Sequence, residues 1–342
     1  MNFKRDICVL TQQDLMDAGC FDMSAAVRVT EDALISYANG DVIFPDKVSV
    51  VFDQATQDRI NCLPAGFRSK KVYGMKWVSV FPDNPHSRDL PNLSASILLS
   101  EMESGFPIAF MEGTMCSNMR TAAVSAVAAK HLAKKEPVSI GFIGCGEQAK
   151  SHFLGMKAVF PSLKLCRVSS RTEASERKFE EQLKHFAPDV EFVRCCGDYR
   201  SAVEGCDIIV TAISGQEKIL QADWIKPGSF YCHVGGLEDD FGVALKADKI
   251  VTDHWAAVKH RTQTISQMYQ AGILADQDIY ADLYEIVTGQ KPGRENAREF
   301  NYYNGVGLSY VDIALSYWMY QKATEHGVGT KIVMQDKSMF DM

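Results

Sequence analysis

The sequence predicts an α/β protein that combines a doubly wound parallel sheet with a second, mixed α/β domain. Two observations lead to this prediction. From residue 138 to residue 252, short apolar runs alternate with segments of helical periodicity, and a glycine-rich turn follows the first of these runs. Such alternation is typical of βαβ units and of a parallel sheet. The 342 residues are sufficient for two domains.

The composition indicates an ordinary globular protein, with 46% hydrophobic and 23% charged residues. The formal net charge of −7 and the pI near 5.7 argue against a nucleic-acid partner, because such proteins usually carry a basic face. The ten cysteines are scattered without CxxC spacing, so we expect reduced thiols and a cytoplasmic protein. No apolar stretch approaches the roughly 20 residues that span a bilayer, so we expect no membrane partner.

The first segment of the chain reads as a helix followed by strands. Residues 23–40 have apolar residues at helical spacing, and Gly40 stops the pattern. Short β-like runs follow at 47–53, 59–65 and 71–81. The stretch SASILLSEMESGFPIAFMEG then places MESG between two apolar runs, which predicts a hairpin turn.

The second segment has the rhythm of a parallel sheet. Its expected strands are residues 138–143, 163–168, 191–194, 208–212, 230–234 and 250–252. A last helical pattern, YVDIALSYWMYQKATEHG, ends at Gly327 and is expected to return to the first domain. We therefore assign residues 1–133 and 301–342 to one domain, and residues 134–300 to a central, inserted domain.

The glycine turn after the first strand of this inserted domain predicts dinucleotide binding. Gly144, Gly146 and Ala149 form G-x-G-x-x-A between the strand SIGFI and a helix. The first glycine permits a tight turn, the second lets a pyrophosphate approach the backbone, and the small third residue lets the helix pack on the strand. The N-terminus of the helix then presents free N–H groups to the phosphates. The expected domain is therefore of the Rossmann type.

The end of the second expected strand bears on which dinucleotide binds. An acid there would bind the ribose 2′-hydroxyl of NAD, but Ser169, Ser170 and Arg171 occupy the position. Hydroxyl groups and a guanidinium suit a 2′-phosphate, so NADP(H) is favoured over NAD(H). Thr172, which follows the second expected strand, and Thr211, near the end of the expected strand 208–212, are also predicted to bind the cofactor. The alternative is that Arg171 is a solvated residue at the start of a helix.

Three basic residues form the predicted substrate site. Arg120 opens the small-residue helix TAAVSAVAAKHLA, where a two-pronged donor beside free N–H groups makes a carboxylate receptor. Lys76 lies in an apolar strand, where a charged side chain needs a partner. Lys47 is a third candidate. The alternatives are a capping or salt-bridge role for Arg120 and a surface position for either lysine.

Several motifs resemble one family. MKWVSVFPDNP, NMRTAAVSAVAAKHLA, IGCGEQAKSH, HVGG, GVGLSYVDIA and GVGTKI occur in the order seen in the ornithine cyclodeaminase/mu-crystallin family. The resemblance implies a homodimer whose N- and C-terminal segments build a substrate-binding and dimerisation domain, while a central Rossmann domain binds NAD(P). DNPHSRDLPNLSASILL and VTGQKPGRENA look most like the opine-type amino-acid dehydrogenase branch.

The resemblance also implies roles for individual residues. Arg120 and Lys76 match the binders of the substrate carboxylate, and Lys47 falls near a third basic ligand. Thr121 matches a neighbour of the nicotinamide. The pyrophosphate turn is matched by Gly144, Gly146, Gln148 and Ala149.

One position departs from the family pattern. Cyclodeaminases place a catalytic Asp shortly after a Gly-Gly-like turn, whereas Gly236 is followed here by Leu237 and then by Glu238, Asp239 and Asp240. A displaced acid can still serve, and which of these three acids is catalytic stays open.

The resulting functional prediction is an NAD(P)-dependent imine reductase or opine-type amino-acid dehydrogenase. The substrate is a small amino or imino acid, and Lys76, Glu238 and Asp240 are the candidate catalytic residues. Two alternatives stay open: an ornithine-cyclodeaminase-type ammonia lyase with bound NAD, and an NADPH-dependent small-molecule binding protein of the mu-crystallin type. No metal site is predicted, because the histidines are isolated in the sequence.

Overall fold

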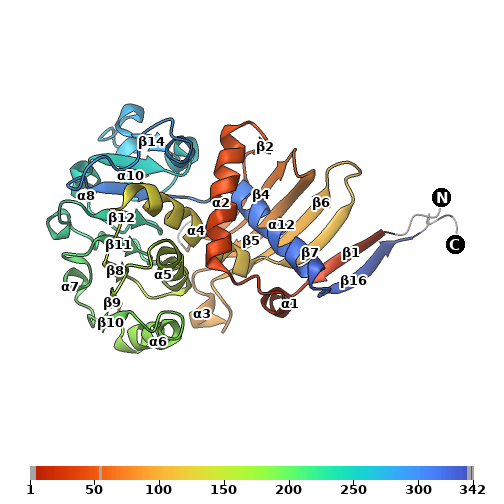
Figure 1. The fold of residues 1–342 in the computed structure, drawn as a ribbon, viewed down its shortest axis with the longest axis horizontal. Coiled ribbons are helices and arrows are strands. Elements are labelled where there is room, and N and C mark those ends of the chain that lie inside the picture. Colours follow the sequence, from red (N-terminus) through yellow and green to blue (C-terminus); the bar gives the residue numbers. More distant parts are fainter. Residues whose placement is uncertain (1–4, 54–55, 337–339, 341–342) are drawn as a thin grey trace. The chain divides into compact units, whose positions relative to one another are not determined.

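The computed structural model describes residues 5–53, 56–336 and 340. It divides into two compact units, Met1–Arg120 with Ser309–Met342 (unit 1) and Thr121–Leu308 (unit 2). Figure 1 shows the ribbon. These limits differ from the boundaries expected at 133/134 and 300/301. Helix α4 (Thr114–Leu132) contains the first junction, and strand β15 (Asn301–Asn304) belongs to the parallel sheet of unit 2.

Unit 1 is built on a mixed eight-stranded sheet. Its order is β16-β1-β7-β6-β5-β4-β2, with β3 paired to β4. The pairing of β1 with β7 is parallel, and the other pairings are antiparallel. The hairpin expected around MESG is confirmed, because β6 and β7 pair on either side of it. The strands are β1 (Arg5–Leu10), β2 (Val42–Ile43), β3 (Val48–Asp53), β4 (Asp58–Phe67), β5 (Val72–Val80), β6 (Leu93–Glu101), β7 (Pro107–Glu112) and β16 (Thr330–Gln335).

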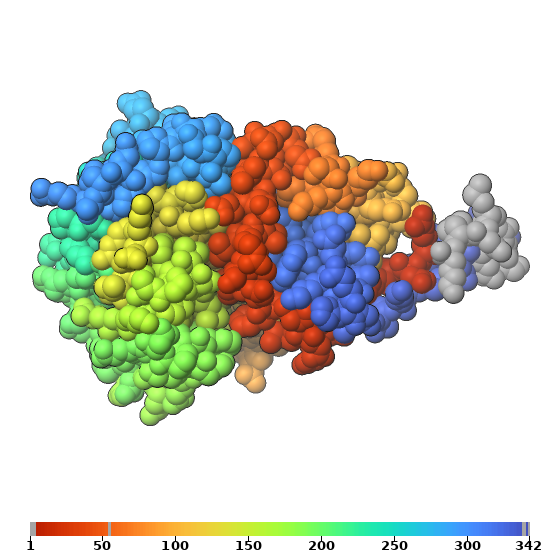
Figure 2. Space-filling view, in the orientation of Figure 1, coloured from red at the N-terminus to blue at the C-terminus, as the bar shows by residue number. Residues whose placement is uncertain are grey.

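Two long helices cover one face of this sheet. The expected helix after residue 22 is α2 (Met23–Ala38), and α12 (Ser309–Glu325) packs against it and against β4, β5 and β6. In Figure 2, α2 is red and α12 is blue on this face. Gly74 of β5 permits the close approach, because a Cβ there would lie 2.5 Å from the carbonyl oxygen of Leu98 and 3.1 Å from Ile313. Unit 1 also contains the short helices α1 (Gln12–Asp17) and α3 (Asn84–Ser87).

Unit 2 contains the expected doubly wound sheet. Its eight strands are all parallel, in the order β10-β9-β8-β11-β12-β15-β13-β14. The six predicted strands are confirmed as β8 (Ser139–Ile143), β9 (Leu165–Ser169), β10 (Glu191–Arg194), β11 (Ile208–Thr211), β12 (Phe230–His233) and β13 (Lys249–Thr252). The prediction missed β14 (Ala281–Asp282) and β15, whose sequence NYYN begins and ends with a polar residue.

Helices flank the parallel strands, which are buried on both faces, as is usual for such sheets. The chain passes from β8 to β9 and β10 in one direction along the sheet and then continues from β11 in the other direction. Ligands of open α/β sheets bind at the carboxyl ends of the strands where this reversal occurs. The helices are α5 (Glu147–Val159), α6 (Glu173–Lys184), α7 (Tyr199–Val203), α8 (Phe241–Lys246), α9 (Trp255–Val258), α10 (Thr264–Gln270) and α11 (Leu283–Val287), with 3₁₀ turns at Ala222–Trp224 and Asp276–Asp278.

Candidate functional site

The glycine turn lies at the carboxyl end of β8, beside β11. Gly144 has φ +102°, and a Cβ there would lie 2.4 Å from the carbonyl oxygen of Ala212. Its N–H donates to the carbonyl oxygen of Ser169 at 2.9 Å. Glycine is therefore required here by the conformation and by the close approach of the neighbouring strand end.

Gly146 is not constrained in this way. A Cβ built on it would meet no atom within 4 Å, so the space beside its backbone is open. Gly146 is the N-cap of α5, whose first N–H groups lie beyond the turn, and Ala149 is fully buried behind it. This cradle fits a pyrophosphate, which a helix N-terminus binds through free N–H groups and a favourable dipole.

The loop after β9 contains one exposed basic residue. Arg171 is exposed, whereas the hydroxyl of Ser170 donates to the carbonyl oxygen of Thr172 at 3.0 Å, and Thr172 caps α6. Glu176, in the first turn of α6, is fully buried. It accepts from the N–H of Ser170 at 2.7 Å and from the N–H of Cys196 at 2.9 Å. Its carboxylate is therefore engaged by the backbone.

Glu238 joins the carboxyl ends of β11 and β12. It is fully buried and accepts from the hydroxyl of Thr211 at 2.7 Å, from the N–H of Ile213 at 2.6 Å and from the N–H of Gly235 at 2.8 Å. Asp240 is the N-cap of α8 and accepts from the N–H of Gly242 at 2.8 Å. Both acids thus hold backbone, and their predicted catalytic role stays a prediction.

A buried histidine completes this loop. His233 lies 2.8 Å from the hydroxyl of Tyr302 and 3.0 Å from Asp239 Oδ1 through Nδ1, and 2.6 Å from the carbonyl oxygen of Gly236 through Nε2. Burial alone would lower the pKa of His233, but the carboxylates of Asp239 and Glu238 outweigh it and raise the pKa to about 9. A protonated imidazole therefore locks the Gly235–Gly236 turn to two carboxylates.

The predicted carboxylate binders of unit 1 are brought together by a third residue. Lys76 Nζ lies 2.6 Å from Asp312 Oδ1, and Arg120 Nε lies 2.9 Å from the same oxygen. Lys76 also donates to the hydroxyl of Ser117 at 3.2 Å. The side chains of Lys76, Arg120 and Asp312 are 1%, 11% and 0% exposed. The structure thus places Lys76 and Arg120 in one buried cluster, which we call the Lys76–Asp312–Arg120 triad.

The triad carries an excess of positive charge. Burial and the neighbouring Arg120 lower the pKa of Lys76 to about 8, and Asp312 offsets part of this effect. With both bases charged, two cations face one carboxylate, so an additional anion is favoured. Asp312 accepts from Nε of Arg120. Among the described residues, the terminal nitrogens Nη1 and Nη2 of Arg120 have no hydrogen-bond partner.

Sequence reasoning missed Asp312. It lies in the expected last helix, between Val311 and Ile313, which are fully buried. The available signal was a single acid in the middle of an apolar helical run, YVDIAL. A buried acid needs a partner, and this requirement pairs it in principle with the equally isolated Lys76.

Three further residues of the predicted site lie in both units. Lys47 is partly buried and immediately precedes β3. Thr121 follows Arg120 in α4, where its carbonyl oxygen accepts from Ser125 at 3.2 Å. Gln148 lies in the first turn of α5. Their ligand-binding roles stay predictions.

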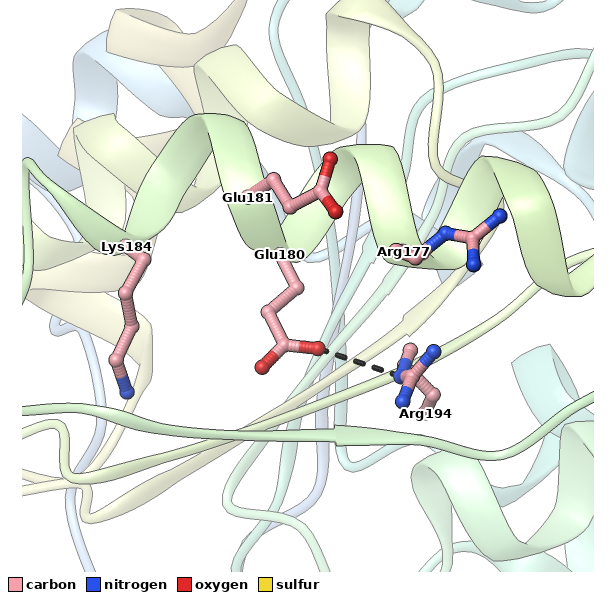
Figure 3. Close-up of a pocket in the computed structure, with 5 residues that line it drawn as sticks. All are labelled: Arg177, Glu180, Glu181, Lys184 and Arg194. Atoms are coloured by element: carbon pink, nitrogen blue, oxygen red, sulfur yellow. Dashed lines mark ion pairs between the residues drawn. The ribbon is translucent and has the colours of Figure 1, made fainter.

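A shallow hollow in unit 2 contains none of the predicted residues. Figure 3 shows the five charged side chains that line it, of which Arg194 Nε lies 3.3 Å from Glu180 Oε2. The hollow lies over α6 and β10 and is lined by Arg177, Glu180, Glu181, Lys184 and Arg194. Within the hollow, Arg194 pairs with Glu180, and Lys184 donates to the carbonyl oxygen of Val190 at 3.0 Å.

The described part of the chain contains neither a metal centre nor a membrane-spanning helix. No group of three or more His, Cys, Asp or Glu side chains in it is placed to hold a metal ion. None of the helices in the described ranges has the length and apolarity needed to cross a membrane.

Comparison with known proteins agrees with the motifs. The sequence profile of the ornithine cyclodeaminase/mu-crystallin family matches residues 6–327, which confirms the resemblance inferred from the sequence. The chain is 30% identical over 332 residues to N-((2S)-2-amino-2-carboxyethyl)-L-glutamate dehydrogenase of Staphylococcus aureus, covering 96% of this chain and 98% of that protein.

Two solved structures share the fold along nearly the whole chain. Δ1-pyrroline-2-carboxylate reductase of Thermococcus litoralis, in complex with NADH and L-proline, has a TM-score of 0.90 at 30% identity and covers 95% of this chain and 100% of its own. An archaeal alanine dehydrogenase dimer with bound NAD has a TM-score of 0.88 at 28% identity and covers 97% of this chain and 100% of its own.

Proposed function

The chain belongs to the ornithine cyclodeaminase/mu-crystallin family, and we propose that it moves hydride between a nicotinamide dinucleotide and the α-carbon of an amino or imino acid. It is an oxidoreductase of carbon–nitrogen bonds, as are the dehydrogenase and reductase relatives matched along nearly its whole length. The observation that carries the proposal is the triad, a buried cationic receptor suited to the substrate carboxylate. When bound, the nicotinamide supplies or accepts the hydride.

The residues of the chain supply binding and proton transfer. Arg120 binds the carboxylate through its free terminal nitrogens, and this contact fixes the α-carbon in position. Lys76, whose pKa is lowered to about 8, exchanges a proton at Nζ close to neutral pH and is our first candidate for the acid or base at the substrate nitrogen. Glu238 and Asp240 support the loop after β12, and this role is the one their hydrogen bonds favour.

The cofactor proposed for this chain is NADP(H). The turn around Gly144 and Gly146 fits a pyrophosphate. Arg171 is exposed after β9, and the buried Glu176 is already occupied by two backbone N–H groups. A 2′-phosphate is therefore better matched here than a 2′-hydroxyl, which needs a free carboxylate.

We also propose a homodimer that forms through the uncovered face of the sheet in unit 1. On the face opposite α2 and α12, strand register aligns Val48, Val50, Trp77 and Phe110. These side chains are 64%, 51%, 49% and 46% exposed, and a contiguous apolar face of this kind is typical of an interface. The dimeric archaeal alanine dehydrogenase makes a second copy the favoured partner.

A cytoplasmic location is likewise proposed. All ten cysteines lie in described parts of the chain and are free thiols, five of them buried. Unpaired cysteines in this number are typical of a reducing compartment.

The experiment that tests the function follows reduced nicotinamide by absorbance, with NADPH and NADH, against amino acids, cyclic imino acids and keto acids with amines. Net oxidation or reduction with one substrate class supports the proposal. Release of ammonia without net change in the cofactor would make the protein a cyclodeaminase. Tight NADPH binding without either reaction would make it a binding protein, and both outcomes would overturn the proposal.

A further inference from the structure

Asp312 is the member of the triad to which no ligand or proton has yet been assigned. Its Oδ1 accepts from Lys76 at 2.6 Å and from Arg120 at 2.9 Å. Its Oδ2 is buried and has no hydrogen-bond partner among the described residues. Lys76 of β5 and Arg120 of α4 therefore both donate to Oδ1 of Asp312, and this shared oxygen links the two bases.

This arrangement fixes the guanidinium of Arg120. A guanidinium has five N–H donors in one plane, and Asp312 takes the donor at Nε. The plane of the group is then set by a carboxylate on the buried first half of helix α12. The two terminal nitrogens are left in a defined orientation, as a two-pronged receptor requires.

The charges lead to the same conclusion. Lys76 and Arg120 would repel each other without an anion between them, and Asp312 supplies one negative charge for two positive charges. The carboxylate of a substrate would supply the second negative charge and neutralise the cluster. Asp312 thus keeps the two bases together and leaves the cluster one anion short.

We infer that Asp312 is a positioning residue, which holds Arg120 and Lys76 in the geometry that receives the carboxylate of the substrate. This inference rests on the proposed function, because it assumes that the triad is the substrate receptor. Asp312 acts through the two bases that it binds, so its removal affects substrate affinity and the ionisation of Lys76 and leaves the cofactor site of unit 2 intact.

The expected pH effect follows from the groups around Lys76. Arg120 and Cys116 face it from α4, Asp312 faces it from α12, and Glu112 at the end of β7 acts on Cys116. Burial and Arg120 lower the pKa of Lys76, and Asp312 raises it. Without the charge of Asp312, the pKa of Lys76 falls further, so the ionisation of Lys76 expected near pH 8 moves to lower pH.

The test compares Asp312→Asn with Asp312→Glu. Steady-state kinetics at saturating NADPH give KM, kcat and the pH profile of kcat/KM, and fluorescence titration gives the Kd of NADPH. For Asp312→Asn we expect KM to rise by about tenfold or more, the ionisation near pH 8 to move to lower pH, and the Kd of NADPH to stay unchanged. Asp312→Glu retains the charge and should restore part of the substrate affinity and the original position of the ionisation.

Asp22→Asn is the matched control, because it makes the same chemical change in the same unit. Asp22 caps α2 by accepting from the N–H of Ala25 at 2.9 Å, and asparagine caps equally well. An Asp312→Asn enzyme with wild-type KM and an unmoved pH profile would overturn the inference. If Asp312→Asn does not fold, Asp312→Glu decides: its longer side chain displaces the carboxylate, so KM should exceed that of the wild type, and a wild-type KM would again overturn the inference.

A binding experiment separates this inference from the proposed function. Pyrrole-2-carboxylate, a planar carboxylate that cannot accept hydride, is titrated calorimetrically into each variant. If wild-type protein turns over no amino or imino acid, the proposed function fails. Weaker binding of this probe by Asp312→Asn would still support the positioning role, and equal binding by both proteins would overturn it.

Discussion

At the scale of single residues, function depends on where side-chain charge is left unsatisfied. Arg120 is only 9% exposed, yet its terminal nitrogens have no partner among the described residues. Arg171, in contrast, is exposed on the loop after β9. We propose that the first arginine binds a carboxylate in a buried cluster and that the second binds a phosphate in solvent. Each leads to a substitution with a distinct readout.

The first prediction concerns Arg120→Lys and Arg120→Ala. Lysine has one compact ammonium without the planar fork, so Arg120→Lys should raise KM for the amino or imino acid sharply. Arg120→Ala should lose about 2 to 5 kcal/mol of substrate binding, as for truncation of a buried charge pair. The Kd of NADPH, measured by fluorescence, should stay nearly constant. Equal losses of substrate and cofactor affinity would make Arg120 a structural residue.

The second prediction concerns the choice of cofactor. Arg171→Asp places an anion where the 2′-phosphate of NADPH is expected, so NADPH should bind more weakly and the preference should shift towards NADH. Arg177→Asp is the matched control, because Arg177 is also exposed and lies on the following helix α6. Both variants are titrated with NADPH and NADH. A wild-type protein that binds NADH at least as well as NADPH would contradict this prediction.

At the scale of elements, the ends of the parallel strands are held by specific backbone requirements. The turn from β8 to α5 contains two glycines in different surroundings. At Gly144 a side chain would strike the backbone of Ala212, whereas at Gly146 it would enter open space. Next along the sheet, Glu238 and His233 fasten the loop after β12 through buried hydrogen bonds. The loop geometry at this edge therefore depends on both conformation and charge.

The third prediction contrasts the two glycines. Gly146→Val should fold normally and lose dinucleotide binding, because its side chain would occupy the space of the pyrophosphate. Gly144→Ala should lower the free energy of unfolding by about 1 to 3 kcal/mol or more, because alanine is strained at that backbone conformation. Urea unfolding and NADPH titration measure the two effects. Normal cofactor binding by Gly146→Val would remove the turn from the site.

The fourth prediction concerns pH and His233. Its pKa rises from 6.5 to about 9 on folding, so its stabilisation is complete below pH 6.5 and is lost as the pH rises through about 9. The free energy of unfolding should therefore fall across this range by more in wild-type protein than in His233→Gln. The difference between the two proteins isolates the histidine from other titrating groups. Parallel pH curves for the two proteins would show that the imidazole is not charged in the fold.

At the scale of the whole molecule, one chain forms two compact units. The first contains the cationic triad, built from β5, α4 and α12, and the second contains the glycine turn. In the described ranges, no helix covers the opposite face of the sheet in unit 1, which exposes Val48, Val50, Trp77 and Phe110, and we propose that this face joins two copies of the chain.

The fifth prediction concerns that assembly. Trp77→Asp and Phe110→Asp place a charge in the apolar face, and a buried, unpaired charge is costly, so each should convert a dimer into the 38.0 kDa monomer. Leu245→Asp is the control, because Leu245 is 60% exposed on α8 of the other unit. Sedimentation velocity at micromolar concentration measures the mass. A wild-type protein that sediments as a monomer would remove the proposed interface.

The sequence by itself determined the parallel sheet, its glycine turn and two of the three residues of the triad. The expectation that Arg120 opens its helix was wrong, because α4 begins at Thr114 and Arg120 lies in its second turn. These features depend on local patterns: alternating apolar runs, glycines at positions that a turn requires, and basic residues in apolar surroundings. The limits of the units were less accessible, because β15 has a polar first and last residue and gains its place only by pairing between β12 and β13. Nor did local pattern show that Glu238 and Asp240 hold backbone.

Only the tertiary structure decided the partners. Lys76 and Asp312 are 236 residues apart in the sequence, and no periodicity relates them. They meet because α12 returns to the sheet of unit 1 and packs on β5, where Gly74 permits close contact. A charged residue in an apolar stretch of the sequence indicates that a partner of opposite charge is needed. Which residue is that partner depends on how distant segments pack.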